Sequence, residues 1–385
     1  MTRKRSQSLA TALGYSLCSA ATLLVGSDQF VYFGTYTGAK SPSQGIYVAT
    51  FDDATGKLAA PELAAEAKSP SFLAIAPSKK FLYAVSEGDG KEGGVSSFAI
   101  DAATGKLTLL NKESSKGAGP CHVSVDPTGN VLLTANYGSG HVASLPIKAD
   151  GSLAAPASVH LQGPASNANP KRQAGPHAHS INVDKAGQFA FACDLGCDKV
   201  FIYKLDNATG TLLPNAPAFA EVPAGSGPRH FAFHPSGQFA YVNNEMTLTV
   251  SGFRYQPTTG ALTLIETLST LPPGESAGPG LSTAETAVHP SGKFVYVSNR
   301  GHDTIACYRC DATTGKLNFM ECAPALVKVP RNFGIDVTGK WMITAGQNSN
   351  SVAVFAIDQE TGKITPTGQT AEVGAPVCVR FMTKY

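Results

Sequence analysis

The segment His234-Pro235-Ser236-Gly237, followed by the run Phe239-Ala240-Tyr241-Val242, carries the pattern that decides the fold. Proline presets the first dihedral of a tight turn, and glycine accepts the positive φ that such a turn needs. Alternating apolar residues on both sides predict two antiparallel strands joined by this turn. Equivalent turns recur at Ala76–Ser78, Asp126–Gly129, Asp184–Gly187, His289–Gly292 and Asp336–Gly339.

A second motif, approximately Asp-x-x-Thr-Gly-x-Leu, alternates with the first. It occurs at Asp52–Leu58, Asp101–Leu107, Asp206–Leu212, Asp311–Leu317 and Asp358–Ile364, with weaker copies at Gln256–Leu262 and Asp150–Leu153. Each copy is a polar turn between apolar runs, so it predicts a second hairpin loop. Two hairpins in each repeat of roughly 50 residues give four strands, and no helical periodicity interrupts them.

Four-stranded repeats of this length are typical of the blades of a β-propeller. The first turn motif gives six full copies, so the seventh blade must be assembled from both ends of the chain. Pro376–Phe381 resembles an innermost strand, and Phe30–Phe33 resembles the run that follows the turn elsewhere. We therefore predict an all-β, seven-bladed β-propeller with four antiparallel strands per blade, closed by pairing of the N- and C-terminal strands. Residues 28–385 would form this single domain.

The composition fits a large β-protein. Of 385 residues, 43% are hydrophobic, and 39 Gly with 25 Pro suit many turns. The 30 basic and 28 acidic residues give a formal net charge of +2, which argues against nucleic acid as a partner. Eight cysteines are too few for a disulfide scaffold, although Cys193 and Cys197 flank a tight turn and could pair after export.

Residues 1–27 differ from the rest of the chain. The basic run Thr2–Arg5 precedes a mainly small and apolar stretch, Leu9–Val25, and small residues follow it. This order predicts a signal peptide and a periplasmic or secreted protein, with a cytoplasmic location as the alternative. Gly14, Tyr15 and Ser16 interrupt the apolar stretch, so no membrane span is predicted.

The innermost strands of a propeller line its central channel, and aligning the turns shows which residues meet there. Five positions before each turn stand Ser71, Cys121, His179, Arg229, Ala284 and Arg331, with Val377 as the seventh. Each returning strand is followed by Tyr36, Glu87, Tyr137, Leu195, Glu245, Arg300 or Gln347. An antiparallel pair brings its start and finish together, so both sets are predicted at one channel mouth, with Arg229 beside Glu245.

The predicted mouth gathers three arginines, two glutamates and a histidine. Such charges are costly to desolvate together unless they serve a ligand, so the cluster indicates a binding or catalytic site. An ion-paired plug that seals the channel is the structural alternative. The excess of arginine favours an anionic ligand.

The segment Gly227–Pro235, continuing to Tyr241–Glu245, resembles the hallmark of the seven-bladed lactonase family. That family includes propeller-type 6-phosphogluconolactonases and a fungal carboxy-cis,cis-muconate cyclase. Further resemblance is carried by Phe33–Thr37, Tyr296–Arg300, Pro330–Gly334 and Ala345–Gln347. It implies a hydrolase that opens the lactone of an anionic sugar acid, with a muconate cyclase as the alternative. A non-catalytic binding module is the alternative from another class, since propellers often serve as docking platforms.

The family's proposed site combines a histidine, two arginines and a glutamate. By motif these correspond to Arg229, Arg300, Glu245 and either His177 or His179, of which the turn register favours His179. An arginine would stabilise the oxyanion formed when water attacks the lactone carbonyl, while Glu245 or His179 takes the proton. The surrounding residues expected to bind substrate are His177, Arg331, Glu87, Tyr137 and Gln347.

The sequence requires no cofactor. His177 and His179 could face the same side of a strand, but no third ligand stands at the spacing of a metal site, so no metal is predicted. No Gly-x-Ser-x-Gly elbow is present either. The expected partner is therefore a small anionic lactone, and a monomer is compatible with the sequence.

Overall fold

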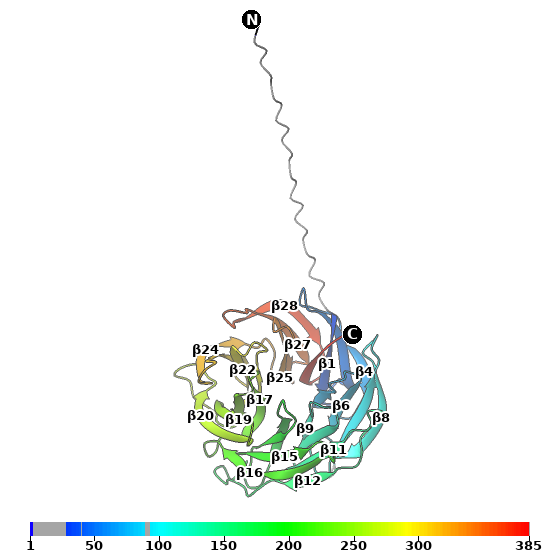
Figure 1. Cartoon of the computed structure of the whole chain (residues 1–385), viewed down its shortest axis with the longest axis vertical. Helices are drawn as coiled ribbons and strands as arrows, with labels where there is room; N and C mark the ends of the chain where they lie inside the picture. The colour runs from blue at the N-terminus through cyan, green and yellow to red at the C-terminus, as the bar shows by residue number, and fades with distance from the viewer. Residues whose placement is uncertain (3–27, 40, 89–92, 385) are drawn as a thin grey trace.

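The computed structural model describes residues 1–2, 28–39, 41–88 and 93–384, and all regular secondary structure in them is β-strand. The strands form seven sheets arranged as a ring (Figure 1). Apart from its first two residues, the predicted signal peptide, 1–27, lies outside this description. None of the described residues belongs to a helix that could cross a bilayer.

Six blades are built from four consecutive strands each, which confirms the repeat pattern. The first blade contains β5(Leu73–Ile75), β6(Phe81–Ser86), β7(Gly94–Ile100) and β8(Leu107–Ser114). The second contains β9(Pro120–Val125), β10(Val131–Asn136), β11(His141–Pro146) and β12(Ser158–Leu161). The third contains β13(Ala178–Val183), β14(Phe189–Asp194), β15(Lys199–Asp206) and β16(Thr211–Glu221). The fourth blade contains β17(Pro228–Phe233), β18(Phe239–Asn244), β19(Thr249–Gln256) and β20(Ala261–Ser269). The fifth contains β21(Ser282–Val288), β22(Phe294–Arg300), β23(Thr304–Cys310) and β24(Leu317–Pro324). The sixth contains β25(Pro330–Ile335), β26(Trp341–Gly346), β27(Ser351–Ile357) and β28(Ile364–Glu372).

The seventh blade joins the two ends of the chain, as predicted. Its innermost strand is β29(Pro376–Thr383), followed outward by β1(Asp28–Thr35) and β2(Gly45–Asp52), while the short β3(Lys57–Leu58) and β4(Glu62–Glu66) both pair with β2. Antiparallel pairing sets Phe33 opposite Val379. The blue and red ends of the chain accordingly lie side by side in Figure 1. Strand β29 also contacts the neighbouring inner strands β5 and β25, so the ring is closed.

The turns have the chemistry that their sequence predicts. In Asp126–Gly129, the side chain of Asp126 accepts hydrogen bonds from the backbone N–H groups of Thr128, Asn130 and Val131. Gly129 has φ +78°, a value that L side chains rarely adopt. His234 replaces the aspartate in its own turn: its Nδ1 accepts the N–H of Ser236, and its Nε2 donates to the carbonyl of Gly292 in the next blade.

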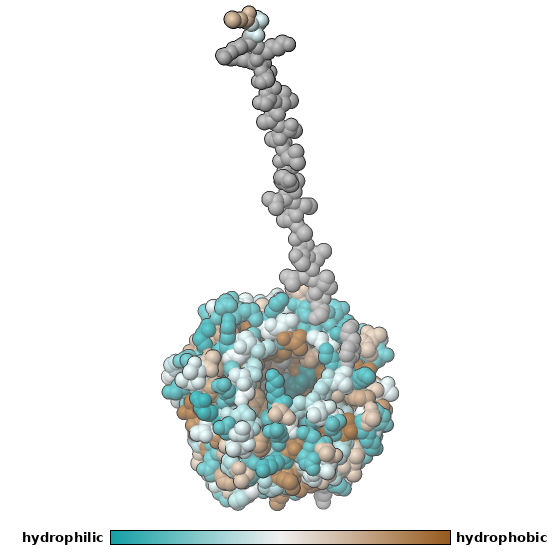
Figure 2. All heavy atoms as spheres, viewed as in Figure 1, coloured by the Kyte–Doolittle hydropathy of each residue, from teal (hydrophilic) through white to brown (hydrophobic). Residues whose placement is uncertain are grey.

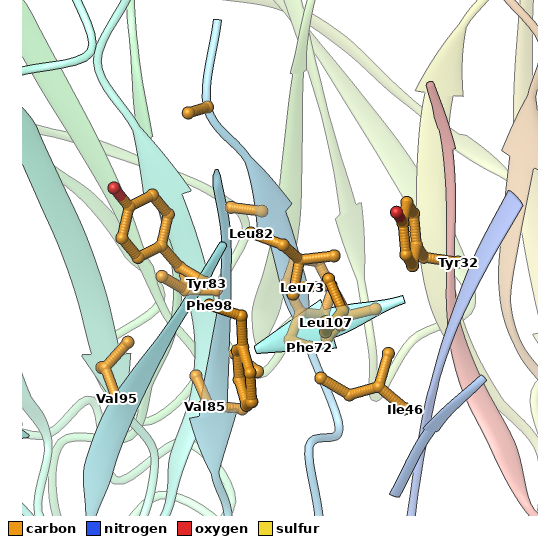
Figure 3. Close-up of a cluster of buried hydrophobic side chains, with 14 of the residues drawn as sticks. Tyr32, Ile46, Phe72, Leu73, Leu82, Tyr83, Val85, Val95, Phe98 and Leu107 are labelled. Carbon is orange, nitrogen blue, oxygen red and sulfur yellow. The ribbon is translucent and has the colours of Figure 1, made fainter. Parts of the chain in front are cut away.

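Neighbouring blades are held together by apolar clusters that contain buried tyrosines. Tyr32, Phe72 and Phe98 belong to such a cluster between β1 and the blade of β5–β8 (Figure 3). The hydroxyl of Tyr32 donates to the carbonyl of Gly105 at 2.9 Å, and Tyr241 and Tyr296 reach the glycine of the next blade's hairpin in the same way. The repeated glycine therefore serves both its own turn and the contact between blades.

The cysteine pair considered from the sequence is not a disulfide in this structure. Cys193 lies in β14 and Cys197 in the turn that follows, and both are buried free thiols. The Sγ atom of Cys197 instead donates to the carbonyl of Gly163 at 3.2 Å.

Candidate functional site

A β-bulge at the start of five of the inner strands directs one side chain of each into the central channel. In β17, Pro228 pairs with Asn244 and His230 with Asn243, so Arg229 has no partner on β18. The strand register shifts in the same way at Cys121, His179, Arg331 and Val377, so each of these residues also lacks a partner on the next strand. A bulge turns the extra residue out of the ladder and re-aims its side chain. The bulged position is the one that the turn alignment singled out, five residues before each turn.

One cavity is lined by eight of the residues predicted to converge. Ala284 does not line it, and neither do five of the residues that follow the returning strands, Tyr137, Leu195, Glu245, Arg300 and Gln347. From the inner strands it is lined by Ser71, Cys121, His179, Arg229, Arg331 and Val377, and from the returning strands by Tyr36 and Glu87, with Phe72 and His230 at its base. The cavity has a volume of about 10 Å³, which is room for about one water molecule. Figure 2 shows that the ring is hollowed at its centre, with hydrophilic atoms inside.

Glu245, at the end of β18, is the centre of an ion-paired cluster. Its Oε2 lies 2.9 Å from Nε of Arg229 and 3.0 Å from Nη2 of Arg300. The predicted contact between Arg229 and Glu245 is therefore confirmed. Its Oε1 lies 2.6 Å from Nη2 of Arg172, in the loop between β12 and β13, which also donates to the Tyr137 hydroxyl. One buried carboxylate is thus shared by three guanidinium groups.

These contacts fix the ionisation of Glu245. Burial alone would raise the pKa of its carboxyl group, but Arg300, Arg229 and Arg172 together lower it to about 2. Arg300 is itself largely buried, with 14% of its side chain exposed, and burial with the repulsion of Arg229 lowers its pKa to about 9. A carboxylate of such low basicity is a poor acceptor for a proton from water. Glu245 is better suited to hold the arginines in position.

Replacing Glu245 with Gln should destabilise the protein by roughly 3 kcal/mol near neutral pH, because it leaves the buried Arg229 without its counter-charge. The stability that ionised Glu245 gives the wild-type protein is present above about pH 4.5 and is lost as pH falls toward 2. The reason is that the pKa of Glu245 is lower in the folded protein than in the unfolded chain. Urea unfolding across this range should show a flatter pH dependence for Glu245→Gln. Glu221→Gln, which alters an exposed pair with Lys199, is the control and should behave as wild type. Equal stability of Glu245→Gln and wild type would contradict this role.

His179 differs from Glu245 because it is neutral and faces the cavity. Burial and the nearby Arg229 hold the pKa of His179 well below its usual value. Its Nδ1 lies 3.7 Å from Sγ of Cys121, and that thiol lies 3.4 Å from the His179 carbonyl. If the thiol donates to the carbonyl, the Nδ1–H donates to sulfur and the imidazole lone pair is on Nε2. Within the described residues, Nε2 has no hydrogen-bond partner, so it can accept a proton from a water in the cavity.

Two arginines offer donors to a ligand. Arg331 lies with its guanidinium 5.4 Å from the centre of the Tyr36 ring, and its side chain makes no hydrogen bond within the described ranges. Arg229 uses Nε and Nη1 on Glu245, His230 and the carbonyl of Ala284, and in the same ranges its Nη2 has no partner. Both side chains line the cavity, so these free N–H groups can receive an anion or a developing oxyanion.

The remaining predicted residues surround this centre. Glu87 accepts hydrogen bonds from the hydroxyls of Tyr36 and Ser71. The ring of Tyr137 stacks on His177 at 4.6 Å and meets His179 edge-on at 5.4 Å, so His177 is placed behind Tyr137. Gln347 is absent from the cavity and lines a wider neighbouring hollow of about 750 Å³, of which Tyr36 forms one wall.

Sequence reasoning missed Arg172, His230 and Glu285. His230 donates from Nδ1 to Oε1 of Glu285 at 2.8 Å, and its Nε2 accepts from Arg229, so it supports that arginine from below. The repeat alignment could have found both His230 and Glu285. Each stands four residues before its turn, directly after the residue that the alignment placed in the channel. Arg172 belongs to a loop without counterpart in other repeats and had no such signal.

Metal ligands are not grouped in the part of the chain that the structure describes: no cluster there brings together three His, Cys, Asp or Glu side chains suited to hold an ion. The cavity at the mouth offers a neutral imidazole, free guanidinium donors and space for about one water molecule.

Comparisons with known proteins agree on one family. A family model described as "Lactonase, 7-bladed beta-propeller" matches residues 30–381. The 6-phosphogluconolactonase of Bacillus subtilis (strain 168) is 37% identical over 356 residues, covering 91% of this chain and 97% of that protein. The solved structure of a periplasmic gluconolactonase from Pseudomonas aeruginosa superposes with a TM-score of 0.86 at 34% identity, covering 93% and 100% of the two chains. A putative 6-phosphogluconolactonase from Bacteroides fragilis gives a TM-score of 0.85 at 32% identity, covering 92% and 98%.

Proposed function

The chain belongs to the family of seven-bladed β-propeller lactonases, and from this premise we propose that it hydrolyses the lactone of an anionic sugar acid at the channel mouth. It is a lactone hydrolase, related to proteins named 6-phosphogluconolactonase and gluconolactonase. The single observation that carries the choice of an anionic substrate is Arg331, a cavity-lining cation without a hydrogen-bonded carboxylate among the described residues.

The charge balance at the mouth supports this choice. Arg172, Arg229 and Arg300 share Glu245, while Glu87 is engaged by two hydroxyl groups near Arg331. Four guanidinium groups therefore face two carboxylates, and an anionic ligand would offset the excess. The hollow beside Tyr36 and Gln347, lined by amide and hydroxyl side chains, offers space and hydrogen bonds for a sugar.

The reaction that this arrangement supports is direct attack by water. A water in the cavity gives its proton to Nε2 of His179 as its oxygen bonds to the lactone carbonyl carbon. The carbonyl oxygen becomes an oxyanion, which the free Nη2 of Arg229 stabilises, while Arg331 holds the anionic group of the substrate. When the ring C–O bond breaks, the imidazolium returns the proton to the departing oxygen, and a hydroxy acid results. Glu245, Arg300 and Arg172 keep Arg229 in position.

The decisive experiment is an assay of the purified protein on a panel of δ- and γ-lactones, with glucono-δ-lactone and 6-phosphoglucono-δ-lactone compared directly. Hydrolysis of the phosphorylated lactone with the higher kcat/KM supports the proposal. Formation of a lactone from carboxylated muconate, with no hydrolysis of sugar lactones, would favour the cyclase instead.

Replacing Arg331 with Gln should lower kcat/KM for 6-phosphogluconolactone by roughly a hundredfold, because a charge-assisted contact is lost. The effect on the uncharged glucono-δ-lactone should be several times smaller. Arg309→Gln is a matched control, since Arg309 is exposed on β23, the third strand of its blade, and donates to the carbonyl of Glu360. An equal loss for both lactones would contradict a role for Arg331 in recognising the anionic group.

Export is part of the proposal and bears on the substrate. The order of basic, apolar and small residues in 1–27 supports a signal peptide, and the relative from Pseudomonas aeruginosa is a periplasmic protein. A sugar-acid lactone of the periplasm or the exterior is then the substrate class. We expect 6-phosphogluconolactone to report on anion recognition even if the cell presents another anionic lactone.

A further inference from the structure

A second cavity lies at the opposite end of the channel. Its volume is about 360 Å³, and it opens beside the turns that carry Pro290 and Val337, at the far ends of the inner strands. Phe72 and His230 line both cavities, so these two side chains form the wall between them. The lactonase site does not use this second space, which we call the distal cavity.

Arg380, on the closing strand β29, supplies the positive charge of the distal cavity. Its Nε donates to the carbonyl of Leu73 at 3.1 Å and its Nη1 to the carbonyl of Val379 at 2.8 Å. The guanidinium lies 4.5 Å from the centre of the Phe72 ring. These contacts hold the group in one orientation, and in the part of the chain described here its Nη2 has no partner.

Two further polar groups on the wall of the distal cavity have no partner. The hydroxyl of Thr286 and Nδ2 of Asn182 are both buried without a hydrogen bond in the described residues, and Thr286 is only 4% exposed. Folded proteins satisfy nearly all buried polar groups, so each exception calls for an explanation. Both residues line the same cavity as Arg380, and a ligand with acceptor oxygens would explain both exceptions.

The negative group in the wall is already engaged. Glu285 accepts hydrogen bonds from Nδ1 of His230, the backbone N–H of Thr286 and Nδ2 of Asn332. Burial raises the pKa of Glu285. Burial also holds the pKa of His122 and His230 well below the usual value, so both rings are neutral. Arg380 is then the one charged residue of this wall that has a hydrogen-bonding atom free for a ligand, within the part of the chain that the structure describes.

We propose that the distal cavity binds a small organic monoanion whose single carboxylate is held by Arg380, Thr286 and Asn182. The body of this ligand is apolar or aromatic, because Phe231, Phe333 and Phe381 form much of the remaining wall. One guanidinium balances one carboxylate, whereas a phosphate dianion would lack a second cation. A volume of this size falls in the range of small-molecule sites. The proposal does not depend on the lactonase activity.

Ligand-observed NMR with benzoate as the probe tests the proposal on the whole protein. We expect saturable binding of benzoate, and binding of the uncharged benzamide that is weaker by about tenfold. Arg380→Gln should weaken benzoate binding by about tenfold or more, and Thr286→Val by several-fold, because the latter removes only the hydroxyl. Arg254→Gln is the matched control: Arg254 also lies over an aromatic ring, that of Phe239, but is exposed on the outer part of a blade.

Three results would overturn the proposal. The first is an absence of saturable benzoate binding. The second is equal binding by wild type, Arg380→Gln and Thr286→Val; if Arg380→Gln fails to unfold cooperatively, Thr286→Val alone decides. The third is loss of benzoate binding in Arg331→Gln with retention in Thr286→Val, since that would place benzoate at the lactonase mouth.

Discussion

Replacing His179 with Gln should lower kcat by roughly 10²–10⁴-fold, the range expected when a general base is removed. The reason is geometric: His179 is the neutral imidazole of the cavity that also holds Arg229 and Arg331, whereas both oxygens of Glu245 are occupied by arginines. Gln keeps much of the shape and can still hydrogen-bond. The KM for the lactone should therefore change little, and the loss should appear in kcat.

The pH profile provides a second readout for His179. A base acts in its unprotonated form, and burial lowers the pKa of His179 from its usual 6.5. The wild-type kcat/KM should consequently stay level as pH falls through 6.5, instead of dropping there as it would with an ordinary histidine. His160→Gln is the control, because His160 lies on the outer strand β12 and contacts the carbonyl of Leu212. Wild-type kcat in His179→Gln would remove it from the mechanism.

Deletion of residues 376–385 should abolish cooperative folding, which is the largest stability effect that we expect. It removes β29, the innermost strand of the closing blade, which pairs with β1 and contacts β5 and β25. The deletion also removes the buried side chains of Cys378 and Met382 from one apolar cluster and that of Val379 from another. The edge of β1 and the apolar faces of the neighbouring blades would be exposed, and exposed edges promote aggregation. Circular dichroism during urea unfolding and size-exclusion chromatography measure the outcome.

Deletion of residues 1–27 is the natural control for that truncation, because it removes no described strand and β1 begins at Asp28. This variant should be folded and hydrolyse lactones at the wild-type rate. A soluble, cooperatively folded protein after removal of 376–385 would show that the ring does not need its terminal closure. Loss of folding in both variants would instead mean that residues 1–27 contribute to the propeller.

The sequence determined the fold of this protein and the register of its channel. The turn Asp126–Gly129 and its copies depend on local chemistry, a side chain that accepts backbone N–H groups and a glycine at positive φ, so they can be recognised without tertiary information. Because every copy marks the same point of a blade, counting five residues back predicted the channel positions of His179, Arg229 and Arg331. The sequence does not show why these side chains face the channel. The β-bulges at these positions explain it, because each bulge turns its residue out of the strand pairing.

The roles that we propose for those residues depend on tertiary contacts that the sequence does not show. Arg172 reaches Glu245 from a loop 73 residues away in sequence, and no repeat pattern encodes that contact. The sequence offered Glu245 or His179 as the base, because basicity depends on burial and on charges from other blades, which a sequence does not show. Three arginines converge on Glu245 and lower its pKa, while burial keeps His179 neutral. Those distances exist only once the ring has closed and brought the separate blades together around one channel.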